Sequence, residues 1–201
     1  MLDLKKHQGP IGQRNRIAFA FMELARDNNF RSLPAAGKLE VIERAQSIGD
    51  ATAVAIKERY NLTDPRRIAE QLGLKVYGES RGVGGKKILR SAYNPERNEI
   101  VIFRDTLEGL LAAVGSKDLQ DHLLRFLVGF ELFHYLERVE VGNVAEKLAL
   151  PPRQIGFLKL SRTIPKLSDV AARAFTQTLL GLDFSPLVFD YLVYALYADL
   201  K

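Results

Sequence analysis

The sequence predicts an α+β fold that is mostly helical, with a small antiparallel sheet packed on helices. Apolar residues recur at three- and four-residue spacing over most of the chain, as they do in amphipathic helices. Between residues 74 and 103 the pattern instead alternates and contains a hairpin signal. The 201 residues are 47% hydrophobic and include no cysteine, which is ordinary for one globular domain without disulfides.

The first sixty residues are predicted to form an N-terminal helical extension. After a lead-in broken by glycines and proline, one helix starts at Arg14 and a second spans Ala35 to Tyr60, which Gly49 is expected to interrupt. The predicted inner face of the second helix consists of Leu39, Ile42, Ala45, Ile48, Ala51, Val54 and Ala55. Residues 61–201 are predicted to be the α+β domain, and the two parts together one compact unit.

A short helix and three strands are predicted at the start of the α+β domain. Thr63 or Asp64 is suited to cap a helix that begins at Pro65 and ends at Gly73. The predicted strands are Leu74–Tyr77, Ile88–Tyr93 and Glu99–Phe103. The turn-forming residues 94–98 join the last two strands into a hairpin.

The second half of the chain is predicted to be helical, except for an irregular segment over residues 153–167. The predicted helices are, in order, Leu107–Val114, Asp121–Glu140, Val144–Leu150, Asp169–Leu180 and Phe184–Leu200. Ser168 is expected to cap the fourth of them, and Gly181 to end it.

Composition narrows the classes of function. The excess of 29 Lys and Arg over 24 Asp and Glu gives a net charge of +5, which favours acidic partners, but the basic residues are scattered. No signal-peptide pattern and no apolar run long enough to cross a bilayer is seen, so we expect a cytoplasmic protein without membrane contact. With three histidines and no cysteine, any metal site would depend on carboxylates.

The helix over Asp121 to Glu140 contains the main chemical signal. Residues Phe130 to His134 follow the frame of the zinc-peptidase motif H-E-x-x-H, with phenylalanine at the first histidine position. In that motif two histidines hold zinc, and the glutamate activates the metal-bound water. The alternative interpretation is a buried Glu131–His134 pair on one helix face, because lone buried charges are costly.

Four stretches occur in an order that resembles the ImmA/IrrE family of metallopeptidase-like proteins. They are Ile68–Val76, the hairpin through Ile100–Ile102, Phe130–His134 and Ala171–Leu180. The resemblance covers roughly residues 60 to 182 and implies a zincin-like core. It also implies Glu131 at the general-base position and His134 at a zinc-ligand position, while Phe130 and Ala171 stand where the family has its other two ligands.

The resemblance therefore implies a degenerate site, with Glu131 as vestigial base and His134 as vestigial ligand. Asp169 lies two residues before Ala171, which would turn it about 200° away from the ligand face of its helix. His122 lies about 18 Å from His134 along a straight helix and could not share a metal with it. We expect no metal and no other cofactor, and we expect Phe130 and Ala171 to fill the former zinc position.

The expected function is a catalytically inactive metallopeptidase-like regulatory or protein-binding domain. Active members of the family cleave transcriptional repressors, so the resemblance implies a protein or peptide partner related to such regulators. One alternative is a divergent active metallohydrolase that uses Glu131, His134 and zinc. The second alternative is a basic DNA-binding regulator that binds nucleic acid.

Three further stretches carry weaker signals. The Gly-rich loop over residues 82–87 could bind phosphate but lacks the P-loop pattern, so we expect a connector. Ile68–Leu74 is typical of the first half of a helix-turn-helix, but a strand-like segment follows it. The C-terminal helix is rich in aromatic residues and either packs on the domain or forms a homodimer surface.

Overall fold

A computed structural model describes residues 15–80, 83–84, 87–88, 90–105, 108, 117–155, 158–183 and 185. These residues form an α+β fold that is mostly helical, as the sequence predicts. The predicted helices over Leu107–Val114 and Phe184–Leu200, apart from residues 108 and 185, and half of the Gly-rich loop over residues 82–87 lie outside the described residues. None of the described helices is long and apolar enough to cross a membrane.

The described helices agree with the predicted ones, except that the short helix over Asn28–Arg31 was not predicted. A first helix covers residues 15–24. It is followed by α2 (Asn28–Arg31), α3 (Ala35–Tyr60), α4 (Pro65–Gln71), α6 (Lys117–Leu136), the π-helix η1 (Glu137–Val141), α7 (Val144–Lys147) and α8 (Leu167–Leu180). The predicted caps of α4 are confirmed: the Asp64 carboxylate accepts the Arg66 amide at 2.9 Å, and Gly73 has a φ of +72°.

The sheet has three strands in the order β1 (Lys75–Glu79), β5 (Glu99–Phe103) and β4 (Ser91–Asn94). The antiparallel β4–β5 hairpin is confirmed, but β1 pairs with β5 in parallel, so the sheet is mixed. Because the strand β1 follows α4 directly, no recognition helix completes a helix-turn-helix there. Two short strands, β2 (Val83–Gly84) and β3 (Lys87–Ile88), form a separate pair.

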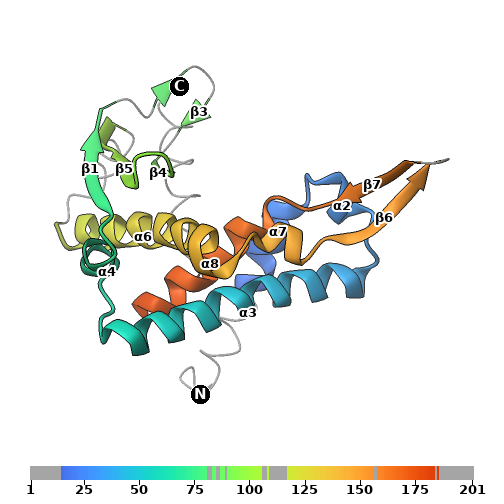
Figure 1. Ribbon diagram of the computed structural model, residues 1–201, viewed down its shortest axis with the longest axis horizontal. Helices are drawn as coiled ribbons and strands as arrows, with labels where there is room; N and C mark the ends of the chain where they lie inside the picture. Colours follow the sequence, from blue (N-terminus) through green and yellow to red (C-terminus); the bar gives the residue numbers. More distant parts are fainter. Residues whose placement is uncertain are drawn as a thin grey trace, which may run out of the picture.

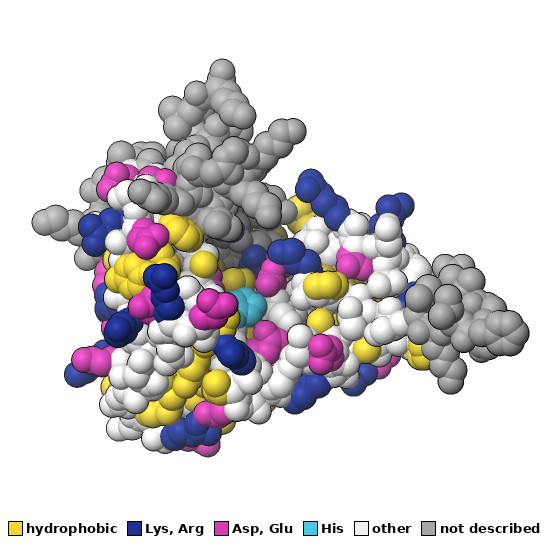
Figure 2. Space-filling view, turned by 45° about the horizontal axis from the view of Figure 1, so that its top comes forward, with side chains coloured by type: hydrophobic (Ala, Val, Ile, Leu, Met, Phe, Trp, Pro, Cys, Tyr) yellow, Lys and Arg dark blue, Asp and Glu magenta, His cyan; other side chains and the backbone are white. Residues whose placement is uncertain are grey.

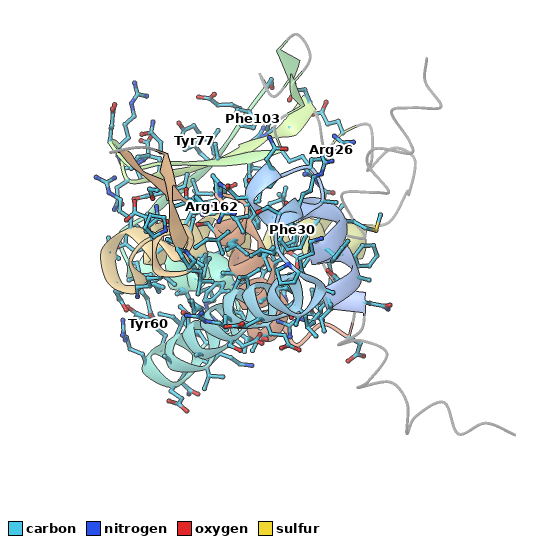
Figure 3. The ribbon with its side chains drawn as sticks, turned by 90° about the vertical axis from the view of Figure 1, so that its right-hand side faces the viewer. Arg26, Phe30, Tyr60, Tyr77, Phe103 and Arg162 are labelled. Atoms are coloured by element: carbon cyan, nitrogen blue, oxygen red, sulfur yellow. The ribbon has the colours of Figure 1, made fainter. Side chains whose placement is uncertain are left out.

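The segment that the sequence predicts to be irregular is a two-stranded ribbon. Strands β6 (Leu150–Ile155) and β7 (Leu158–Arg162) pair in antiparallel fashion, with a shift in register after Leu150. Two prolines in β6 make its sequence untypical of a strand, because proline cannot donate a hydrogen bond to a neighbouring strand. Figure 1 shows the ribbon projecting from the helices, and the side-chain view labels Arg162 close to the first helices (Figure 3).

The helices are stacked beneath the sheet. In Figure 1, α6 lies under β4 and β5, and α8 lies between α6 and α3. One cluster of buried apolar residues extends from the first helix through α3, α8 and α6 to β5. The N-terminal helices therefore share their core with the rest of the chain.

Gly49 does not interrupt α3, contrary to the prediction, because it serves a packing contact. A Cβ atom at this position would lie 2.1 Å from the Ala171 carbonyl oxygen of α8. The buried face of α3 is accordingly centred on this glycine and consists of Val41, Ile42, Ala45, Gln46, Gly49, Ala53 and Ile56. Leu39 and Val54, predicted to be on the inner face, are 42% and 47% exposed.

We predict that Gly49→Ala destabilises the fold by about 2 kcal/mol or more, because the added methyl group must push two helix backbones apart. The matched control is Gly37→Ala in the same helix, where a Cβ would be 3.5 Å from its nearest neighbour. The control should be neutral or gain up to about 1 kcal/mol from helix propensity. Equal unfolding free energies for the two variants in urea titrations would contradict the close crossing.

Candidate functional site

Glu131 lies in the middle of α6 and reaches the sheet. Its side chain is buried, and its carboxylate accepts hydrogen bonds from the Ser91 hydroxyl at 2.7 Å and from the Tyr93 backbone amide. Burial raises the pKa of Glu131, and these hydrogen bonds oppose the shift only in part. The carboxyl group is thus hydrogen-bonded to β4 and not to His134, whereas the alternative interpretation of the sequence pairs Glu131 with His134.

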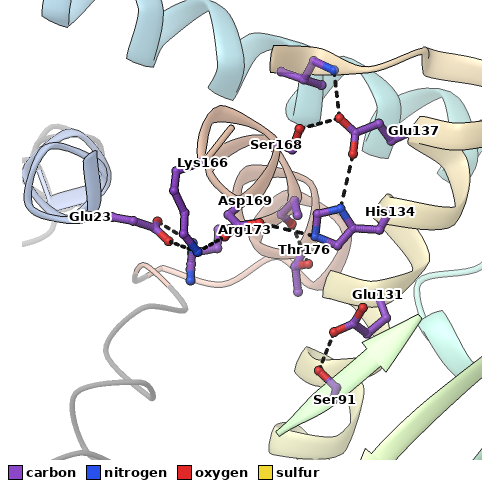
Figure 4. A network of polar contacts seen from close by, with 12 residues as sticks. Glu23, Ser91, Glu131, His134, Glu137, Lys166, Ser168, Asp169, Arg173 and Thr176 are labelled. Carbon is purple, nitrogen blue, oxygen red and sulfur yellow. Dashed lines mark hydrogen bonds and ion pairs between the residues drawn. The ribbon is translucent and has the colours of Figure 1, made fainter. Parts of the chain in front are cut away.

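His134, one turn further along α6, lies between two carboxylates. Its Nδ1 atom is 3.2 Å from Glu137 Oε2, and its Nε2 atom is 3.6 Å from Asp169 Oδ1. Glu137 comes from the start of η1 and Asp169 from the first turn of α8, so the imidazole links the two helices (Figure 4). Both ring nitrogens therefore face an acceptor, which favours the doubly protonated ring.

The pKa values of His134 and Glu137 shift in opposite directions. Burial lowers the pKa of His134, but the hydrogen bond to Glu137 and the nearby charges of Glu131 and Asp169 raise the pKa above its ordinary value. Burial raises the pKa of Glu137, yet its hydrogen bonds with His134, Ser168 and the Val144 amide bring the net pKa below its ordinary value. Both shifts favour an imidazolium–carboxylate pair.

Ser168 takes part in this centre and does not cap α8 as predicted. Its hydroxyl donates to Glu137 Oε1 at 2.6 Å, and the same oxygen accepts the Val144 amide at 2.8 Å. The N-cap position of α8 is occupied by Lys166, without a side-chain cap. Glu137 thus fastens the beginnings of α7 and α8 to the end of α6.

Two cationic side chains extend the network from α8 toward Glu23 of the first helix. Lys166 Nζ is 2.5 Å from Asp169 Oδ2, and Arg173 Nη1 is 2.5 Å from Glu23 Oε2. Burial raises the pKa of the Glu23 carboxyl despite the charge of Arg173. We call the alternating series of Arg173, Glu23, Lys166, Asp169, His134 and Glu137 the ion-pair network (Figure 4). Acidic and basic side chains also gather around a histidine on the face shown in Figure 2.

Phe130 packs into this network. Its ring lies edge to face with the His134 imidazole, with 4.9 Å between the ring centroids. The Arg173 guanidinium lies over the same ring at 5.2 Å from the centroid, within cation–π range. At the position where the peptidase motif has its first histidine, the protein therefore has an aromatic ring covered by a cation.

The structure does not bring Ala171 to His134. Ala171 is buried where the α8 backbone touches Gly49 of α3. Asp169 and Arg173 face α6 instead, as does Thr176, which is the nearest neighbour of a Cβ built on Gly129. The prediction that Asp169 points away from the site is wrong: the two helix faces were correctly placed about 200° apart, but α8 is turned so that Asp169 meets His134.

The described residues do not fit a zinc site. They contain no group of three or more His, Asp or Glu side chains arranged to hold a metal ion. His134, Asp169 and Glu137 each use their polar atoms in ion pairs, and the helix that carries both His122 and His134 runs unbroken past Gly129. The helix keeps these two histidines apart, as the sequence predicts.

The comparisons with known proteins add no relative. No family model matches the chain, and no match was found among the curated proteins or the solved structures searched. The resemblance to ImmA/IrrE proteins thus rests on the four stretches of sequence alone.

Sequence reasoning missed most of the ion-pair network. Glu137 had a local signal, because it is three residues after His134 and such residues meet on a helix surface. Lys166 had the same signal, because it lies three residues before Asp169. Glu23 had none, because it approaches Arg173 and Lys166 only through the packing of separate helices.

The paired shifts predict a pH dependence of stability. Because the folded-state pKa of His134 is raised, its contribution is fully present below the ordinary value of about 6.5 and is lost as pH rises through the folded-state pKa. The unfolding free energy of the native protein minus that of His134→Gln should therefore fall from pH 6 to pH 9, by about 1 kcal/mol.

Urea unfolding across this range measures the difference, and His122→Gln, whose wild-type side chain is exposed, serves as the matched control. On the acid side, the lowered pKa of Glu137 should preserve its contribution until pH falls below about 4.5. A difference that is constant or that grows between pH 6 and pH 9 contradicts the double ion pair.

Proposed function

We propose that this protein is a catalytically inactive, metallopeptidase-like regulatory domain that binds a protein or peptide partner. The observation that carries the proposal is His134, held by Glu137 on one nitrogen and facing Asp169 on the other. A histidine that binds zinc must offer one nitrogen as a free lone pair, whereas this arrangement favours protons on both.

The surrounding charges support the same conclusion. Lys166 and Arg173 are cations placed where they compensate the carboxylates of Asp169 and Glu23 without a metal ion. Phe130 supplies no ligand and instead packs under Arg173. On this proposal the site lacks a metal for two reasons: ligands are missing, and protein cations already balance the negative charge of its carboxylates.

The proposed partner follows from the resemblance. Active members of the ImmA/IrrE family cleave transcriptional repressors in the cell interior, so a segment of a transcriptional regulator is the proposed class of partner, and the cytoplasm the proposed location. A domain that retains such a scaffold without chemistry would act by occupancy, holding or shielding its partner.

We predict that protein purified without added metal contains far less than one zinc per chain by elemental analysis. We also predict that its melting temperature is unchanged, within about 1 °C, by EDTA or by equimolar zinc. A ligand that binds only the native state raises stability, and we expect zinc not to bind it. Stoichiometric zinc that disappears in His134→Ala, together with a melting temperature lowered by EDTA, would favour the divergent metallohydrolase instead.

The geometry also predicts which substitution would restore metal binding. Phe130→His adds a second imidazole one turn from His134 and close to Asp169, so it should bind zinc with a Kd of about 1–100 μM, weakly because Lys166 and Glu137 compete. Ala171→Glu should add no affinity, because that position faces Gly49.

Isothermal titration with zinc distinguishes the two designs, and the unfolding free energy provides the control for folding. Ala171→Glu should lower stability by about 3 kcal/mol or more through a buried charge at a close helix contact. If Phe130→His needs Ala171→Glu in order to bind zinc, the alignment that pairs Ala171 with the family ligand is right, and our placement of Asp169 as the nearer donor is wrong.

A further inference from the structure

A groove of about 510 Å³ lies away from the ion-pair network, between β1, the end of β5 and the N-terminal half of α6. Its floor is apolar and consists of Val76, Ile102, Leu124 and Val128. Val76 is 37% exposed, although it is a large apolar side chain. The volume is within the range of sites that hold peptides and small ligands.

One wall of the groove is the outer strand of the sheet. β1 pairs only with β5 among the described strands, and the Lys75 amide donates to the Asn98 carbonyl at 3.2 Å. In a parallel ladder alternate residues point their amides and carbonyls the same way, so those of Val76 and Gly78 point away from β5. An unpaired edge of this kind is a template for another strand.

Gly78 allows a cation to lie across this strand. A Cβ atom at Gly78 would be 2.3 Å from Arg104 Nε, so the arginine side chain occupies the space that any other residue would fill. No ion pair among the described residues involves Arg104, whereas Arg66, also on the groove, is paired with Asp64 and Asp121. The rim also carries the acidic side chain of Glu108, so Arg104 is the place in the groove where a cation without an ion pair among the described residues is found.

We propose that the outer edge of β1 binds an extended peptide segment of a partner protein, with an acidic side chain placed against Arg104. The backbone groups of Val76 and Gly78 would hydrogen-bond to the added strand, and the apolar floor would receive its inward side chains. Figure 3 labels Tyr77 and Phe103 in the sheet layer, above the helix that contains Phe30. The site shares no residue with the ion-pair network, so it does not depend on the proposed loss of zinc.

The test uses fluorescence anisotropy of a labelled eight-residue peptide of alternating valine and glutamate. We expect the full-length chain to bind it at least ten times more tightly than the same peptide with lysine in place of glutamate. The key variant is Val76→Pro, which removes an outward-pointing amide, replaces the valine side chain by the proline ring and is tolerated at a sheet edge. It should lower affinity at least tenfold, while Val76→Thr, which keeps the amide and the shape, should retain binding.

The charge at the groove is tested separately. Arg104→Gln should abolish the preference for glutamate over lysine, whereas Arg97→Gln, an exposed arginine in the β4–β5 turn, should leave the preference intact. Circular dichroism confirms that each variant is folded. The proposal is overturned if the acidic peptide does not bind, if Val76→Pro binds it unchanged, or if lysine and glutamate peptides bind equally. A dimer seen by sedimentation and abolished by Val76→Pro would overturn it in favour of a second copy of this chain.

Discussion

The close crossing of α3 and α8 fixes the geometry on which the candidate site depends. Because Gly49 has no side chain, the backbone of α8 approaches α3 directly at Ala171. Polar contacts secure the same interface, since the Thr178 hydroxyl donates to Asp50 at 2.5 Å and Lys57 donates to the Thr178 carbonyl at 3.2 Å. The rotation of α8 about its axis is thereby set, and with it the residues that α8 presents to α6.

That rotation decides the chemistry of the site. It turns Asp169 and Arg173 toward α6, where they meet His134 and Phe130. Charged side chains that are partly buried need compensating charges nearby, and here cations and carboxylates alternate in sign from Arg173 through Glu23 to Glu137. Glu131 is outside this alternation; its pKa is raised by burial, and it is bonded to Ser91 instead. On our proposal, protein cations have taken over the role that a metal ion has in active members of the resembling family.

The sequence was sufficient to predict most helices and strands, but not the rotation of α8 about its own axis. The caps at Asp64, Gly73 and Gly181, the hairpin at residues 94–98 and the bounds of α3 are local features, and all are confirmed. The site residues depended on which face of α8 meets α6, and an alignment centred on Ala171 placed that face about half a turn away. Gly49 held the missing information, but a glycine within a helical pattern can mark either a break or a close contact, and the sequence alone does not separate the two. The β6–β7 ribbon was missed because its prolines mask strand propensity.

The most direct test of the account is a double-mutant cycle between His134 and Asp169, measured by urea unfolding at pH 6 in the presence of EDTA. The variants are His134→Gln, Asp169→Asn and their combination. We predict that His134 and Asp169 are coupled without metal, with an interaction energy of about 1 kcal/mol or more that declines toward pH 9. The opposite result is an interaction energy that is near zero in EDTA and becomes measurable only when zinc is added. It would contradict a metal-free pair and would identify the two side chains as metal ligands.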